Sequence, residues 1–213
     1  MNRRTLLAGA GTVASGSLAG CTSRLFGGTP DGVVLDPQED QIADSEDLAY
    51  PAYGQPLPSF ELSAPLAEKT FDSDALDRTA LVTGVFTFCP AECSILLRQW
   101  ARIQGRVADA GLTEDVYFLP ITFDPERDDA DRLAAYADRM NVDTDAGNWR
   151  FLRPASKARA EAVVADAFGM QFQRTHPEEM DTYMFAHSAL TLLANADGYV
   201  ERTYRTSSPS PED

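Results

Sequence analysis

Two cysteines and a histidine are the side chains of this 213-residue chain whose types and spacing could support metal or redox chemistry. Cys89 and Cys93 are separated by three residues and follow a long apolar run. The second cysteine comes where the next helix is expected to begin. The free N–H groups and positive dipole of a helix N-terminus favour a thiolate over a thiol, so we expect lowered pKa values for these cysteines.

Three interpretations of the Cys-x-x-x-Cys spacing remain open at this point. A structural disulfide suits an exported domain, because such domains meet oxidising conditions. A redox dithiol is the second, although the usual thioredoxin motif has two intervening residues and this one has three. Metal ligation is the third, since soft thiolates select Cu(I) or Zn(II) and an added imidazole allows the same site to hold Cu(II).

The imidazole has two possible sources, because the chain contains only His176 and His187. His187 directly precedes an apolar run that begins at Ser188 and is predicted to be a strand. We expect the start of that strand to lie near the cysteine turn, at the edge of the sheet. A lone histidine is more often an ordinary core or surface residue, but the cysteine pair favours a metal site made of Cys89, Cys93 and His187.

The elements that must position these residues alternate between strand and helix. Apolar runs and helical spacing predict strands at 80–88, 116–123, 188–193 and 199–204 and helices at 94–108, 128–140 and 157–168. Short segments at 60–62 and 69–71 predict an earlier hairpin. This order indicates an α/β, thioredoxin-like fold, with a central mixed sheet flanked by helices and an N-terminal hairpin extension. The chain is long enough for one such domain, which we place at 51–205.

The segments outside that domain have a different composition. Residues 1–20 carry paired arginines and a mildly apolar stretch too short to span a bilayer, as in a twin-arginine export signal. The stretch from Leu18 to Cys21 resembles a lipobox, and the glycines at positions 9, 11, 16 and 20 argue against a buried N-terminal helix. Residues 21–50 are predicted to be a lipidated, acidic, flexible tether, and 206–213 a disordered tail. We therefore expect a protein held by Cys21 at the outer face of the cytoplasmic membrane.

The charge balance excludes one class of partner. Thirty-three acidic residues against eighteen basic ones give a formal charge of −15, which repels a phosphate backbone. Nucleic acid is therefore not an expected partner. The acidic residues are scattered, which is more typical of a solvated surface adapted to high salt, as in a halophilic protein, than of an acidic docking face.

Several short motifs together carry a family resemblance. They are Phe88–Cys93 (FCPAEC), Thr122–Asp128 (TFDPERD), Trp149, His187-Ser188 and Asp197-Gly198. In order and separation they resemble the signatures of the SCO/SenC family, and they cover about residues 54–204. Each motif is modest alone, but their joint order is specific.

The resemblance implies a copper metallochaperone of thioredoxin fold that delivers copper to the dinuclear copper (CuA) centre of cytochrome c oxidase. It implies Cys89, Cys93 and His187 as ligands of Cu(I) or Cu(II), and the copper-bearing subunit of a haem-copper oxidase as partner. The alternative function is a thiol-disulfide oxidoreductase that uses Cys89 and Cys93 to keep the oxidase cysteines reduced. A peroxide-reducing relative is a third possibility, but Phe88-Cys89-Pro90 lacks the Thr-x-x-Cys pattern typical of that class.

The sequence departs from the family pattern near the predicted ligands. Ser94 stands where many relatives have a second proline, so we expect a less rigid turn after Cys93. Ala186 stands where relatives often have a polar or acidic residue that could orient the imidazole. The group that orients the imidazole must therefore come from elsewhere in the chain or be absent; the candidates are Glu178, Glu179 and Asp181. The segment TFDPERD is interpreted as a turn and helix cap.

Overall fold

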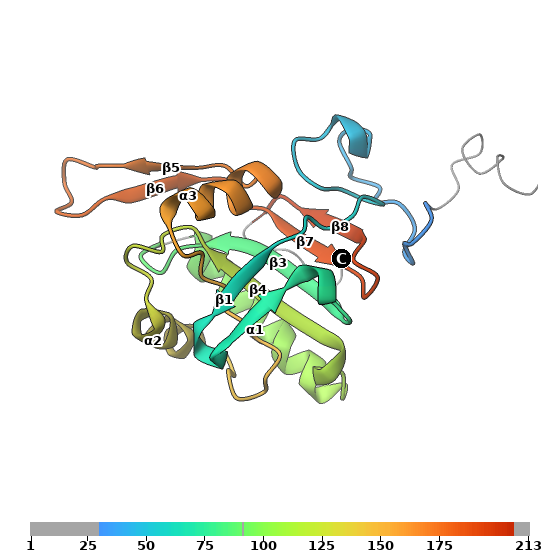
Figure 1. Cartoon of the computed structure of the whole chain (residues 1–213), viewed down its shortest axis with the longest axis horizontal. Helices are drawn as coiled ribbons and strands as arrows, with labels where there is room; N and C mark the ends of the chain where they lie inside the picture. The colour runs from blue at the N-terminus through green and yellow to red at the C-terminus, as the bar shows by residue number, and fades with distance from the viewer. Residues whose placement is uncertain (1–29, 91, 207–213) are drawn as a thin grey trace, which may run out of the picture.

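The computed structural model describes residues 30–90 and 92–206, and Figure 1 shows the arrangement of the elements. The strands are β1 (Glu61–Ala64), β2 (Lys69–Asp72), β3 (Thr79–Val85), β4 (Val116–Thr122), β5 (Phe172–Thr175), β6 (Met184–His187), β7 (Thr191–Ala194) and β8 (Val200–Tyr204). The helices are α1 (Glu92–Asp109), α2 (Ala130–Met140), α3 (Lys157–Ala160), the π-helix η6 (Glu161–Ala167) and short 3-10 turns at Ser45–Asp47, Pro65–Ala67, Ser73–Ala75 and Thr113–Asp115. The predicted signal peptide (1–20), Cys21 and the end of the predicted tail (207–213) lie outside the described residues.

A four-stranded mixed sheet forms the centre of the domain, in the order β4-β3-β7-β8. The pair β3 and β4 is parallel, because α1 carries the chain back to the starting edge between them. The pairs β3–β7 and β7–β8 are antiparallel. The predicted mixed sheet flanked by helices is confirmed.

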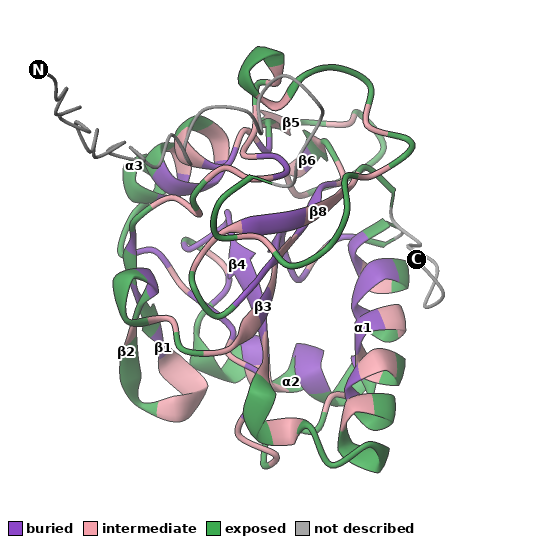
Figure 2. Ribbon diagram, turned by 90° about the vertical axis from the view of Figure 1, so that its right-hand side faces the viewer, coloured by how far each residue is buried: buried purple, intermediate pink, exposed green. Residues whose placement is uncertain are grey.

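Helices and a hairpin cover the two faces of this sheet (Figure 2). In that view α1 lies on one side, while α3 and the β1–β2 hairpin lie on the other. The inner face of α1 buries Leu97 and Trp100 completely, and the central strands bury Val82, Leu119 and Leu192. The helical spacing of apolar residues in α1 therefore identifies the face that packs against the sheet.

The predicted N-terminal hairpin is confirmed. Its strands β1 and β2 pair antiparallel, with Leu62 opposite Phe71. Leu62 is buried, and Phe71 contacts Tyr117 of β4 edge to face, with 5.8 Å between the ring centroids. The hairpin thus extends the fold and covers part of the core.

Four predicted elements differ in the structure. The strand expected over 80–88 ends at Val85. The helix expected over 128–140 begins at Ala130, because the side chain of Asp129 caps it by accepting a hydrogen bond from the Arg132 N–H. The helix expected over 157–168 is α-helical for one turn and continues as η6. The strand expected from Ser188 begins later, at Thr191.

A second hairpin, β5–β6, was not predicted. Its strands pair antiparallel from Phe172 opposite His187 to Thr175 opposite Met184, and they form a two-stranded sheet separate from the central one. In Figure 1 this hairpin projects to the left of the domain. His187 is therefore the last residue of β6, and it does not lie directly before a strand of the central sheet as predicted, because β7 begins only at Thr191.

The described part of the predicted tether, residues 30–50, is bound to the domain. Both carboxylate oxygens of Glu201 on β8 accept hydrogen bonds from it, from the N–H of Val34 at 2.7 Å and of Leu35 at 2.9 Å. Asn195 joins the same cluster, because its amide nitrogen donates to Glu201 at 2.6 Å and to the Gly32 carbonyl at 2.7 Å. The structure thus differs from the predicted flexible tether over residues 30–50.

Gly169 shows how closely this segment lies against the domain. Its φ of +68° is a left-handed conformation, which favours glycine. A Cβ atom added there would lie 2.0 Å from the carbonyl oxygen of Ala49. Only glycine therefore leaves room for the backbone of residues 49 and 50 at this position.

Replacing Glu201 with alanine is expected to release the 30–50 segment and lower the free energy of unfolding by about 2 kcal/mol, because the N–H groups of Val34 and Leu35 and the buried amide of Asn195 lose their acceptor. Urea denaturation measures the loss, and hydrogen exchange at Val34 and Leu35 locates it. Glu39, an exposed residue of the same segment, supplies the control variant Glu39→Ala. Equal protection of residues 34 and 35 in both variants would contradict the assignment.

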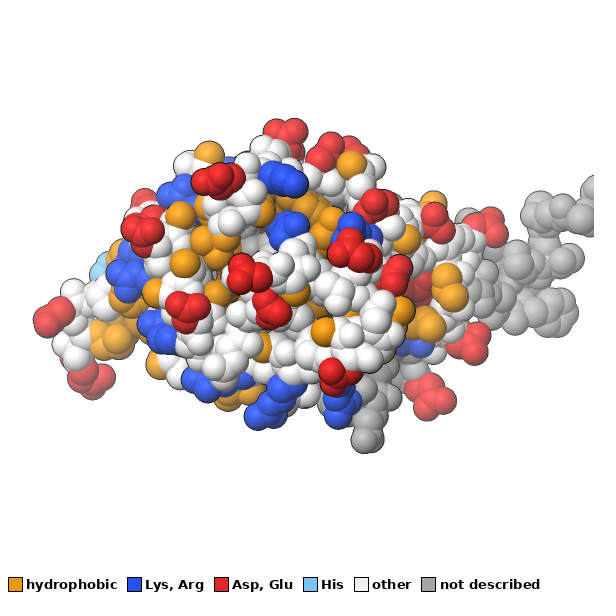
Figure 3. All heavy atoms as spheres, turned by 90° about the horizontal axis from the view of Figure 1, so that it is seen from below, with side chains coloured by type: hydrophobic (Ala, Val, Ile, Leu, Met, Phe, Trp, Pro, Cys, Tyr) orange, Lys and Arg blue, Asp and Glu red, His pale blue; other side chains and the backbone are white. Residues whose placement is uncertain are grey.

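Charged side chains are dispersed over the face drawn in Figure 3, where acidic groups alternate with basic and apolar ones. Among residues 30–90 and 92–206, no helix is long and apolar enough to cross a bilayer.

Candidate metal centre

Cys89 lies in the loop that connects β3 to α1. The strand ends at Val85, and the loop closes by a hydrogen bond from the Cys89 N–H to the Phe86 carbonyl at 3.2 Å. Ser94 donates its hydroxyl to the Cys89 carbonyl at 3.0 Å. A proline at position 94 could not make this bond, so the serine provides its own link across the turn that we expected to be less rigid.

Cys93 lies in the first turn of α1. Its side chain is 2% exposed, and its backbone N–H donates to the sulfur of Cys89 at 3.3 Å. The helix N-terminus thus offers a backbone donor to the first cysteine while carrying the second. No disulfide joins Cys89 to Cys93.

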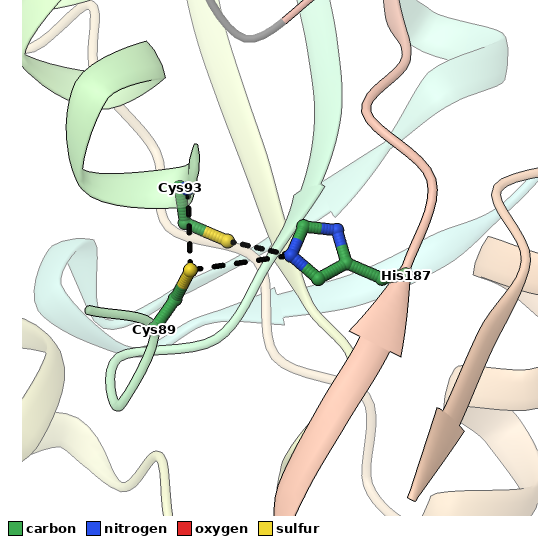
Figure 4. A group of neighbouring side chains, drawn as sticks. All are labelled: Cys89, Cys93 and His187. Atoms are coloured by element: carbon green, nitrogen blue, oxygen red, sulfur yellow. Dashed lines mark hydrogen bonds between the residues drawn. The ribbon is translucent and has the colours of Figure 1, made fainter. Parts of the chain in front are cut away.

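His187 reaches the two sulfurs from the end of β6, as Figure 4 shows. Its Nε2 lies 3.5 Å from Cys93 Sγ and 4.0 Å from Cys89 Sγ. One donor atom from each of the three residues lies within 4.8 Å of the other two. Among the residues that the structure describes, this is the only such group of histidine, cysteine or acidic side chains that could hold a metal ion.

The pKa of the Cys93 thiol is raised well above its ordinary value. The hydrogen bond with Cys89 is the largest cause, and burial and the charge of Cys89 add to it. The prediction that the helix N-terminus lowers this pKa is therefore wrong. Ionising both of two adjacent buried sulfurs has a high free-energy cost unless a cation binds between them.

The pKa of His187 is raised by its neighbours. Burial alone would lower it, but contacts with Cys89 and with the Ser188 carbonyl together outweigh that effect. The Ser188 carbonyl oxygen lies 3.3 Å from His187 Nδ1. A backbone carbonyl at Nδ1 favours a proton there, which leaves the Nε2 lone pair directed at the sulfurs.

The acidic residues proposed to orient the imidazole do not take that position. Glu178, Glu179 and Asp181 lie in the connection between β5 and β6, and the group at Nδ1 is the Ser188 carbonyl. The other histidine, His176, lies in the same connection and contacts the ring of Tyr183 instead of the sulfurs. The choice of His187 over His176 agrees with the geometry.

Aromatic rings form an apolar wall behind the imidazole. The ring centroids of Phe86 and Phe123 lie 5.8 Å and 5.5 Å from that of His187. Phe185, two residues earlier on β6, packs edge to face on both phenylalanines. This wall limits the rotamers of the imidazole and keeps the dielectric constant around the donor atoms low.

The β3–α1 loop that carries Cys89, called the cysteine loop below, is fixed by Asp128, which is fully buried. Its carboxylate accepts hydrogen bonds from the Thr87 N–H at 3.1 Å, the Thr87 hydroxyl at 2.6 Å and the Thr122 hydroxyl at 2.5 Å. Burial raises the pKa of Asp128, while the bonds from Thr122 and Thr87 act in the opposite direction. Thr87 is two residues before Cys89, so Asp128 fixes the start of the loop.

Neighbouring aspartates therefore have different structural roles. Asp128→Ala should lower the free energy of unfolding by about 3 kcal/mol, because it leaves buried donors of Thr87 and Thr122 without an acceptor. Asp129→Ala removes only a helix cap and should cost about 1 kcal/mol. Urea denaturation of the reduced, metal-free protein measures both losses. Equal losses would show that Asp128 is no more than part of the turn.

Sequence reasoning missed part of the function of the TFDPERD segment. The cap predicted there exists, but it is Asp129, one residue beyond the motif. Asp128 instead holds the cysteine loop, and Arg127 contacts Phe88 of the same loop. The spacing of acidic residues after a buried strand was the available signal, but it does not reveal a partner 41 residues earlier in the chain.

A family model described as SCO1/SenC matches residues 53–213. The mitochondrial SCO1 homologue of Homo sapiens is 26% identical over 152 residues, which is 71% of this chain and 47% of that protein. The chain therefore spans about half the length of this curated relative.

Solved structures of similar fold include a SCO1/SenC family lipoprotein from Bacillus anthracis, with a TM-score of 0.58, 22% identity and coverage of 77% of this chain and 89% of that one. Arabidopsis thaliana ScoI with copper bound has a TM-score of 0.56 and 22% identity, over 70% and 86% of the two chains. BsSco, described as a Sco family cytochrome c oxidase assembly protein with a disulfide switch, has a TM-score of 0.56 and 21% identity over 76% and 86%. These similarities confirm the thioredoxin-like fold of Sco proteins.

Proposed function

Because this chain belongs to the SCO1/SenC family, we propose that it binds one copper ion through Cys89, Cys93 and His187 and delivers it to the CuA centre of cytochrome c oxidase. The observation that carries the proposal is the convergence of two sulfurs and one imidazole nitrogen within 4.8 Å. The three donors come from a loop, a helix and a separate hairpin.

The donor set suits copper in either oxidation state. Two thiolates bind Cu(I), and the imidazole supports Cu(II). The copper would be cargo rather than a permanent cofactor. The relative from Arabidopsis thaliana, whose structure contains copper, supports this choice of metal.

The burial of the ligands indicates how the cargo would leave. Cys89 and Cys93 are 5% and 2% exposed, whereas His187 is only half-buried. An acceptor thiolate would approach from the side of His187, replace the imidazole first and then the two sulfurs. The oxidase as acceptor is supported by the description of BsSco as an assembly protein.

The second candidate function is reduction of disulfides in the oxidase subunit. Its supporting observation is that the side chains of Cys89 and Cys93 are adjacent and not joined by a disulfide, with the Cys93 N–H directed at the Cys89 sulfur. A dithiol of this kind can form a disulfide with little movement. Such a reductase does not need His187.

Copper titration of the reduced protein tests the binding part of the proposal. Cys21 is replaced by alanine so that only two thiols remain. Saturation at one copper per chain is expected, because the described residues contain one candidate metal site. A stoichiometry of two, or no binding at all, would remove the basis for the assignment.

We also propose that the mature protein is anchored by a lipid on Cys21 at the outer face of the cytoplasmic membrane, after export by the twin-arginine route. The paired arginines and the lipobox-like residues 18–21 support this, as does the lipoprotein relative from Bacillus anthracis. A two-chain lipid is sufficient to hold a soluble domain at a membrane surface.

Cys21→Ala is expected to move the protein from the membrane fraction to the soluble fraction while leaving copper binding unchanged, since the anchor is separate from the three ligands. Fractionation of cells followed by immunoblotting gives the distribution. Continued membrane association of the variant would indicate an uncleaved N-terminal segment instead.

A further inference from the structure

We propose that Arg127 is a positioning residue that holds the β5–β6 hairpin against the cysteine loop and thereby sets the distance of His187 from the two sulfurs. The inference rests on the proposed copper site. It assigns a function to a residue that does not itself touch a ligand.

Arg127 binds the hairpin at the start of β6. Its Nη1 donates to the Thr182 hydroxyl at 2.9 Å and to the Tyr183 carbonyl at 2.8 Å. Its guanidinium carbon lies 3.6 Å from the centroid of the Tyr183 ring. These contacts fix both the backbone and the side chain of Tyr183, four residues before His187.

The same guanidinium group contacts the cysteine loop. Its carbon lies 4.3 Å from the centroid of the Phe88 ring, and Phe88 immediately precedes Cys89. Arg127 therefore lies between the residue that precedes the first ligand and the strand that carries the third. A planar cation suits this position because it can stack on aromatic rings and donate several hydrogen bonds at once.

Arg127 is itself held in place by Asp124. The Arg127 Nε donates to Asp124 Oδ2, and the side chains are 14% and 0% exposed. The other carboxylate oxygen of Asp124 accepts a hydrogen bond from the Tyr183 hydroxyl at 2.8 Å. Arginine, aspartate and tyrosine thus form a closed, largely buried group that favours one orientation of the guanidinium.

The hairpin needs such a fastening because it is a separate sheet. Its two strands pair only with each other, and a two-stranded hairpin is marginally stable alone. Phe185 supplies an apolar contact with Phe86 and Phe123, but apolar packing is not directional. The hydrogen bonds of Arg127 are directional, so they fix the orientation of the hairpin relative to the cysteine loop.

The test compares Arg127→Leu with Arg132→Leu in the Cys21→Ala background. Arg132 is the matched control, since its guanidinium carbon lies 4.5 Å from the same Phe88 ring but it belongs to α2. Arg127→Leu should weaken Cu(II) binding by about 10- to 100-fold, because loss of a group that orients a ligand typically costs that much. Cu(I) binding, which needs only the two thiolates, should change by less than about threefold. Arg132→Leu should leave both unchanged.

A double-mutant cycle shows whether Arg127 acts through His187. In a His187→Ala background, Arg127→Leu should cause no further loss of Cu(II) affinity, because the imidazole it positions is gone. An equal further loss, or a Cu(II) affinity of Arg127→Leu within about threefold of the parent, would overturn the inference.

Hydrogen exchange of the metal-free protein tests, without copper, whether Arg127 holds the β5–β6 hairpin in place. Exchange at residues 184–187 should speed up in Arg127→Leu and not in Arg132→Leu. This measurement separates the inference from the proposed function: a parent that binds no copper refutes the latter, while unchanged exchange refutes the former. If Arg127→Leu does not fold, Arg127→Lys replaces it, because lysine keeps the charge but not the planar fork.

Discussion

Cys93→Ser is expected to lower the affinity for copper by more than about a thousandfold, equivalent to about 4 kcal/mol. The variant removes one of two soft thiolates and leaves Cys89 with a hydroxyl that binds copper poorly. The sulfur of Cys93 is also the one nearer to His187, at 3.5 Å from Nε2. Titration against a competing chelator of known affinity measures the loss.

Ser94→Ala is the control for this substitution. It removes the hydrogen bond to the Cys89 carbonyl but leaves all three donor atoms in place. Its copper affinity should stay within about tenfold of the parent. Copper binding that is the same in Cys93→Ser and the parent would mean that the metal lies elsewhere.

The pH dependence of copper binding is a second test of Cys93 as a ligand. The raised pKa keeps the Cys93 thiol protonated at neutral pH, so copper must displace this proton. Affinity should therefore rise as pH increases, about tenfold per pH unit for each proton displaced, until the thiol pKa is reached. The proton released by Cys93 should be absent in Cys93→Ser.

His187→Ala is expected to abolish the thiolate-to-Cu(II) charge-transfer absorption and to prevent restoration of oxidase assembly, while dithiol exchange is retained. The variant leaves Cys89 and Cys93 intact, and two thiolates can still hold Cu(I) but support Cu(II) poorly. Absorption spectroscopy, complementation of a strain lacking the protein and reduction of a disulfide substrate measure the three properties.

His176→Ala is the matched control, because His176 contacts Tyr183 and lies away from the sulfurs. It should keep the absorption and the assembly activity. If His187→Ala assembles active oxidase at the parental level, copper delivery is wrong, and the reductase function takes its place. Loss of dithiol exchange in His187→Ala would instead show that the imidazole is needed for thiol chemistry.

Local patterns in the sequence were sufficient for the central elements. The apolar run before Cys89 predicted β3, and the helical spacing of Leu96 and Trp100 predicted α1. These patterns are reliable because a buried strand and a one-sided helix each display their environment within a few neighbouring residues. The family resemblance is confirmed by the match over residues 53–213.

The position of the cysteines on the fold could also be predicted from the sequence. Cys89 follows β3 and Cys93 lies in the first turn of α1, and both facts depend only on where one strand ends and the next helix starts. His187 was selected because it precedes a predicted strand that we expected near the cysteines, and the resemblance indicated the same histidine. Its ligand function stays a prediction.

Contacts between distant residues were decided by the tertiary structure alone. His187 and Cys89 are 98 residues apart, and their approach depends on the β5–β6 hairpin, which shows no clear alternation in the sequence. Two further contacts also join residues far apart in the sequence: Arg127 binds Tyr183, and Glu201 binds the 30–50 segment. The pKa of Cys93 follows the same principle: the helix N-terminus is visible in the sequence, but the buried sulfur beside it is not. The hydrogen bond with Cys89, burial and neighbouring charge raise this pKa despite the helix N-terminus, and all three arise only when the chain is folded.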